Sequence, residues 1–160
     1  MHRMIFQYDV QRLQAHPDIN EDVDIYITTT DGHWRIVWPI LWPIGVNAPH
    51  GRLRGWKAIE VLLHLGQFQY RVSFRQRDGA TERDWAKWRL GTLDLAHREA
   101  MIELASQDEV NEVGGGNCRH CVARIARLMV ARPGETGFRY HDVEAALHHA
   151  AAWDVSMGYY

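Results

Sequence analysis

The residue types best suited to chemistry lie in the stretch 114–121, which reads Gly-Gly-Gly-Asn-Cys-Arg-His-Cys. Asn117 is a good helix N-cap, and the apolar period after it predicts a helix from residue 118 to about residue 131. Cys118 then faces unpaired backbone N–H groups and the positive end of that helix, and both favour a thiolate. Cys118 is therefore a candidate nucleophile whose neighbouring N–H groups could hold an oxyanion. The plainer interpretation is a small apolar residue in the core.

A thiol nucleophile needs a base, and His33 is the candidate. Residues 23–30 alternate and are rich in β-branched side chains, which predicts a strand. Asp31 and Gly32 predict a two-residue hairpin turn, so the returning strand, residues 33–38, starts at His33. The large apolar side chains of that strand lie on the face opposite His33. A histidine on a strand beside the cysteine helix could take the thiol proton; the alternative is a surface histidine next to a turn.

Two short boxes resemble those of a known family. Residues 33–37, His-Trp-Arg-Ile-Val, resemble the H-box of the LRAT-like, circularly permuted NlpC/P60 proteins, and residues 117–122, Asn-Cys-Arg-His-Cys-Val, resemble their NC box. These H-box/NC proteins include phospholipid acyltransferases and some picornaviral 2A proteins. The resemblance covers about residues 20–131. It implies a papain-like α+β fold in which Cys118 is the nucleophile and His33 the base.

The same resemblance implies a third polar residue that orients the base. His50, in Asn-Ala-Pro-His, is the candidate. The chain departs from the family's NC box at Arg119 and Cys121, which stand where the family has Glu and Phe. The activity implied is thiol-dependent hydrolysis or acyl transfer at an amide, ester or thioester. The substrate would be a lipid, a peptide or a peptidoglycan-like acyl compound, and no cofactor would be needed.

The two cysteines also allow a zinc site. His97 and Glu99 read as H-x-E, and Cys118 with Cys121 reads as C-x-x-C. In zinc-dependent nucleoside or nucleobase deaminases, one histidine and two cysteines bind zinc and the glutamate shuttles protons. The segment between the two motifs is short for the strand that this class needs, and Asn117 stands where the class has proline. Despite these departures, the presence of both cysteines in one motif keeps zinc as the alternative cofactor.

The rest of the chain predicts one α+β domain spanning residues 1–160. The expected elements are a strand at 68–75, helices at 81–90, 92–105 and 142–153, and a loop at 39–55. The loop repeats the tripeptide Trp-Pro-Ile, and its two prolines argue against a central strand there. The expected architecture is an antiparallel sheet packed against helices.

Composition limits the partners. The net charge of −2 gives no general attraction to nucleic acid, and the longest apolar run, residues 38–46, is too short for a transmembrane segment. The N-terminus has no signal-peptide core, which suggests a cytoplasmic protein, in the host cytoplasm if the chain is viral.

A third class of function also stays open. The chain could be a catalytically silent interaction module that presents its Trp-Pro-Ile loop to a host protein.

Overall fold

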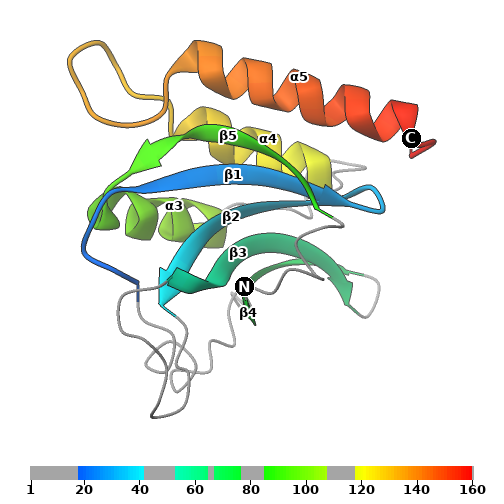
Figure 1. The fold of residues 1–160 in the computed structure, drawn as a ribbon, viewed down its shortest axis with the longest axis horizontal. Helices are drawn as coiled ribbons and strands as arrows, with labels where there is room; N and C mark the ends of the chain where they lie inside the picture. Colours follow the sequence, from blue (N-terminus) through cyan, green and yellow to red (C-terminus); the bar gives the residue numbers. More distant parts are fainter. Residues whose placement is uncertain (1–17, 42–52, 65–66, 77–84, 108–117, 160) are drawn as a thin grey trace.

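A computed structural model describes residues 18–41, 53–64, 67–76, 85–107 and 118–159 of the chain. These residues form an α+β fold in which five strands make one antiparallel sheet in the order β4-β3-β2-β1-β5 (Figure 1). The strands are β1 (Val23–Thr30), β2 (His33–Leu41), β3 (Leu53–His64), β4 (Gln67–Gln76) and β5 (Ala86–Leu93). The helices in the described ranges are α3 (Leu95–Gln107), α4 (Cys118–Leu128) and α5 (Tyr140–Ser156). The expected class, an antiparallel sheet packed against helices, is confirmed.

One face of the sheet carries the main core and is covered by the helices. Ile25 and Ile27 of β1 and Ile36 of β2 are fully buried there, in the same cluster as Val122 and Ile125 of α4. The helices α3 and α5 contribute further buried apolar side chains, namely Met101, Ala105, Val143, Ala146, Leu147 and Ala150. The alternation predicted for β2 is confirmed, because its tryptophans and isoleucines lie in this core. The opposite face buries a smaller cluster around Val37, Trp56 and Ala58.

The turn between β1 and β2 is the tight hairpin that the sequence predicts. Asp31 and Gly32 have φ angles of 50° and 76°, and a type I′ turn needs positive values at both positions. The register pairs Thr30 with His33, so His33 is the first residue of β2. A Cβ atom on Gly32 would lie 3.0 Å from the Cβ of Tyr159. Backbone conformation and packing therefore both favour glycine beside His33.

The predicted helix at 81–90 is wrong in its described part, where Ala86–Leu93 forms the strand β5. The spacing of Trp85 and Trp88 fits a helix turn, but Lys87 and Arg89 alternate with more buried residues as a strand requires. The deciding partner is distant in sequence, because β5 pairs antiparallel with the free edge of β1. The helix predicted at 92–105 is present as α3, but its predicted start is wrong, because residues 92 and 93 belong to β5 and α3 begins at Leu95.

The prediction of a loop at 39–55 is also wrong at both ends, because β2 includes Pro39 and ends at Leu41, and β3 begins at Leu53. Pairing of β2 with β1 stops at Val37, whereas pairing with β3 continues to Leu41. Pro39 therefore lies where β2 has a partner strand on one side only, which is where a strand tolerates a missing N–H. The second Trp-Pro-Ile tripeptide lies outside the described residues.

The length and polarity of the helices can be compared with what a transmembrane segment needs. The longest of them in the described ranges, α5, has 17 residues and carries several charged and polar side chains. No helix in the described part of the chain is long and apolar enough to cross a membrane.

Candidate functional site

Cys118 is the first residue of α4, as predicted, and its sulfur lies against the start of β2. The Sγ atom is 3.9 Å from the carbonyl oxygen of Gly32. It also shares hydrogen bonds with the side chain of His33 and with the backbone N–H of Trp34. Three consecutive residues of the hairpin thus surround one sulfur atom. The structure brings the predicted nucleophile and the predicted base into contact.

Glu60, a carboxylate that the sequence analysis did not single out, contacts the other side of the base. Glu60 lies in β3 directly opposite Arg35 of β2, and only 3% of its side chain is exposed. Its Oε2 atom accepts a hydrogen bond from Arg35 Nε at 2.7 Å and lies 3.1 Å from His33 Nε2. Because His33 and Arg35 are two residues apart on one strand, both reach the same carboxylate. Cys118, His33 and Glu60 therefore form a connected triad.

The electrostatics keep Glu60 ionised and His33 protonated. Burial alone raises the pKa of Glu60, but hydrogen bonds from His33 and Arg35 outweigh it and lower that pKa to about 2. The pKa of His33 is raised from 6.5 to about 9, first by its hydrogen bond with Cys118 and then by that with Glu60. Partial burial of the ring and the positive charge of Arg35 oppose this rise.

The pKa of the Cys118 thiol is shifted in the opposite direction, downward. Burial raises the pKa of Cys118, but the hydrogen bond with His33, the Trp34 N–H and the nearby positive charges hold it below its ordinary value of 9.0. Arg119, the next residue of α4, is one of those charges. A lowered thiol pKa beside a raised imidazole pKa favours a thiolate–imidazolium pair, and the two groups titrate as one unit.

The third residue of the site was not found from the sequence. His50, the residue predicted for this role, lies outside the described residues. A signal for Glu60 was present, since it is the single carboxylate in the otherwise apolar run 58–63 and a buried carboxylate needs a cationic or hydrogen-bonding partner. The missing information was the register between β2 and β3, which places Arg35 opposite Glu60.

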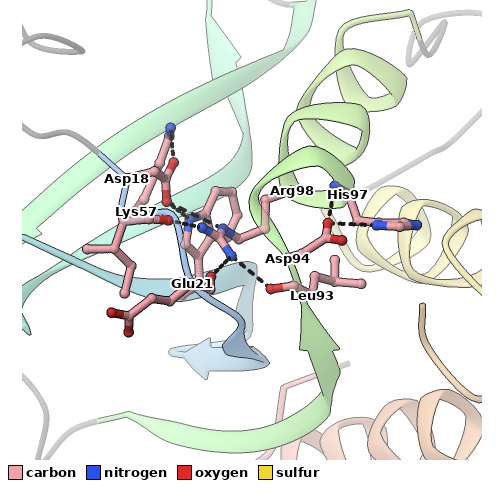
Figure 2. A network of polar contacts seen from close by, with 9 residues as sticks. Asp18, Glu21, Lys57, Leu93, Asp94, His97 and Arg98 are labelled. Carbon is pink, nitrogen blue, oxygen red and sulfur yellow. Dashed lines mark hydrogen bonds and ion pairs between the residues drawn. The ribbon is translucent and has the colours of Figure 1, made fainter. Parts of the chain in front are cut away.

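The residues of the alternative zinc site do not converge. His97 Nδ1 lies 2.7 Å from Asp94 Oδ1, which also accepts the His97 backbone N–H at 2.8 Å and so caps α3. Figure 2 shows His97 and Arg98 pointing to opposite sides of α3. Cys121 is 1% exposed and faces the main core. Among the described residues, no three His, Cys, Asp or Glu side chains are grouped so that they could hold a metal ion.

Comparison with known proteins adds no relative to these observations. The chain matches no protein-family model, no curated protein and no solved structure.

Proposed function

We propose that this chain is a thiol-dependent hydrolase or acyltransferase of H-box/NC type, with the permuted papain-like arrangement, that acts on an amide, ester or thioester. One observation carries the proposal: Cys118 at the start of α4 hydrogen-bonds His33, whose Nε2 lies 3.1 Å from the buried carboxylate of Glu60. Cys118 is the nucleophile, His33 the base and acid, and Glu60 the group that orients His33. Such a thiol must stay reduced, which suits the cytoplasm.

In the acylation step, the Cys118 thiolate attacks the carbonyl carbon of the substrate. A C–S bond forms and the π electrons of the carbonyl move to its oxygen. The first N–H groups of α4 have no acceptor within the helix, so they are placed to stabilise this oxyanion. When the carbonyl re-forms, the bond to the leaving group breaks, and the His33 imidazolium donates a proton to the departing amine, alcohol or thiol.

In the deacylation step, neutral His33 removes a proton from water or from another acceptor. That acceptor attacks the thioester carbon, and Cys118 departs as a thiolate, which restores the starting ion pair. Water as acceptor gives hydrolysis, and an alcohol or amine gives acyl transfer. Ionised Glu60 has no proton to give, so Nε2 carries the hydrogen of their contact and Nδ1 is the nitrogen available to exchange protons with the thiol.

A generic activated ester tests the proposal. On incubation with p-nitrophenyl acetate, intact-protein mass spectrometry should detect one acetyl group on Cys118, with release of p-nitrophenol. Cys118→Ala should reduce the rate by at least about 10³-fold, because it removes the nucleophile.

The matched control is Cys121→Ala, which removes the other cysteine of the same helix. This buried residue lies one helix turn from Cys118, and its loss should leave acetylation of Cys118 in place. A folded wild-type protein that is never acetylated on Cys118 would refute the proposal. Stoichiometric zinc that is lost on His97→Ala would favour the deaminase instead.

A further inference from the structure

Asp154, near the end of α5, is a fully buried carboxylate for which the proposed mechanism has no use. Its Oδ1 accepts a hydrogen bond from Thr29 Oγ1 at 2.7 Å, and its Oδ2 accepts one from Trp34 Nε1 at 2.5 Å. Oδ2 also forms an ion pair with Arg119 at 3.1 Å. One side chain of the last helix therefore holds β1, β2 and α4 together.

Two of these contacts, with Trp34 and with Arg119, reach the neighbourhood of the Cys118–His33 pair. Trp34 directly follows His33, and its backbone N–H contacts the sulfur of Cys118. Arg119 directly follows Cys118, lies 6.0 Å from the centre of the Trp34 ring, and lowers the thiol pKa through its charge. The two sides of the thiol–imidazole contact are thus fixed to the same carboxylate.

Tyr159, five residues after Asp154, contacts the β1–β2 turn that precedes His33. Tyr159 donates its backbone N–H to the Asp154 carbonyl at 2.8 Å and its hydroxyl to Asp31 Oδ1 at 2.9 Å. The Tyr159 side chain packs on Gly32 in the turn that precedes His33. Figure 1 shows the C-terminal end of α5 and the β1–β2 turn at the same end of the molecule.

We propose that Asp154 is a positioning residue of the active site: it fixes Trp34 and Arg119 so that the Cys118 thiol keeps its contacts with His33 and the Trp34 N–H. This inference rests on the proposed function, since it assigns a task within the same site. Asp154 does not touch the reacting atoms and acts through the residues beside them.

Positioning and direct charge effects have opposite signs here. The negative charge of Asp154 acts through space against a second negative charge on Cys118, so its removal by field alone would lower the thiol pKa. Loss of positioning would raise the thiol pKa, because the sulfur would lose the Trp34 N–H, the nearby Arg119 charge and its alignment with His33. The direction of the change therefore identifies the role.

The test is the rate at which iodoacetamide alkylates Cys118 as a function of pH, with the modified residue identified by mass spectrometry. Asp154→Ala should shift the rise in rate to higher pH and slow alkylation at pH 6 by about tenfold. Asp154→Asn keeps the size and one acceptor oxygen, so it should shift the profile in the same direction by less. If the alanine variant does not fold, the asparagine variant alone decides. An unchanged profile, or a shift to lower pH, would overturn the inference.

Two further variants distinguish a specific effect of Asp154 from a general weakening of the contact between α4 and α5. Glu144 of α5 pairs with Arg127 of α4 at 2.7 Å, away from Cys118, so Glu144→Gln weakens another contact between the same two helices. It should leave the profile unchanged, and a shift as large as that of the Asp154 variants would overturn the inference. In an Arg119→Gln background, Asp154→Asn should have a smaller effect than in the wild type, because part of its action passes through Arg119.

The wild-type profile separates the two proposals. If the alkylation rate of Cys118 rises at low pH in the wild type and at the same pH in the Asp154 variants, only the positioning role is refuted. A wild-type Cys118 with an ordinary thiol profile refutes the proposed function, and the positioning role falls with it.

Discussion

Asp18 and Glu60 are both carboxylates that contact two cationic side chains, at different places in the fold. Asp18 pairs with Lys57 at 2.7 Å and with Arg98 at 3.5 Å. Glu60 pairs with Arg35 at 2.7 Å and with His33 at 3.1 Å. The number of charges is the same, so the functions of the two groups must differ through the chemistry of their members.

The two cations paired with Asp18 are buried and bind only other parts of the chain in the contacts that follow. Arg98 is fully buried and donates to the backbone carbonyls of Ile19 at 2.6 Å, of Glu21 at 2.8 Å and of Leu93 at 2.8 Å (Figure 2). The other cation, Lys57, is 7% exposed and lies 5.8 Å from the ring centre of Trp38. Every one of these contacts joins one part of the chain to another, so the network fastens α3 and β3 to the segment before β1.

The Glu60 group is open and titratable. Its histidine is 25% exposed, and the imidazole contacts a thiol as well as the carboxylate. A proton can therefore move between the imidazole and the thiol within this group. A buried carboxylate is therefore structural in this chain where its partners are a lysine and an arginine that bind neighbouring elements, and it becomes part of a candidate site where one partner is a histidine beside a nucleophile.

The largest effect on stability is expected for Arg98→Met. The substitution leaves three backbone carbonyls without their donor and Asp18 without one of its two ion-pair partners, which should cost about 3–5 kcal/mol of unfolding free energy. Urea unfolding followed by tryptophan fluorescence measures the loss. The alkylation profile of Cys118 in the folded variant should match the wild type. A loss below about 1 kcal/mol would contradict a structural role for the network.

Glu60→Gln should act mainly on chemistry. The neutral amide no longer stabilises the His33 imidazolium, so the pKa of His33 should fall from about 9 toward 6.5 and the acetylation rate at pH 7 should drop about 10- to 100-fold. The pH–rate profile with p-nitrophenyl acetate measures both effects, and its basic limb should move to lower pH. Asp24→Asn, the same change at an exposed carboxylate, is the matched control. A basic limb that stays in place would exclude Glu60 as the partner of the base.

The raised pKa of His33 also makes stability depend on pH. Its pKa is about 9 in the folded chain and 6.5 ordinarily, so folding favours the imidazolium. The stabilisation is complete below pH 6.5 and is lost as the pH rises through about 9. The difference in unfolding free energy between wild type and His33→Gln should therefore shrink by roughly 1–2 kcal/mol between pH 6 and pH 10. A difference that is constant over this range would contradict the thiolate–imidazolium pair.

The sequence predicted the parts of the fold that local patterns determine. The alternation of β1, the Asp31-Gly32 turn and the apolar stripe of α4 each follow from neighbouring residues, and each is confirmed. Where a distant partner decides, the prediction failed. The segment 86–93 becomes a strand because β1 offers a free edge, and Pro39 is accepted in β2 because the pairing of β2 with β1 stops at Val37.

The candidate site divides in the same way. Cys118 and His33 were predicted because each stands beside a local signal, a helix start and a hairpin turn. Glu60 and Asp154 stand beside no helix start or hairpin turn, since their roles come from the β2–β3 register and from the packing of α5. A lone acidic residue in an apolar run, as at Glu60, is the one trace that the sequence holds of such a role.

The smallest effect is expected where a carboxylate pairs with a cation at the surface. Asp24 accepts hydrogen bonds from Thr92 Oγ1 at 2.8 Å and Arg89 Nε at 2.9 Å, and both charged side chains are nearly half exposed. Burial alone would raise the pKa of Asp24, but these two hydrogen bonds hold it below its ordinary 3.8. A lowered carboxyl pKa stabilises the fold above that value, and the benefit is lost as the pH falls through the folded pKa.

Asp24→Asn should therefore cost only about 0.2–1 kcal/mol at pH 7, because solvent screens an exposed pair. Urea unfolding at low and high salt checks this, and added salt should reduce the difference from wild type. The pair joins β1 to β5 but has no thiol or imidazole beside it in the described residues, so the Cys118 profile should not move. A loss as large as that of Arg98→Met would mean that burial does not separate the strong charge networks of this chain from the weak ones.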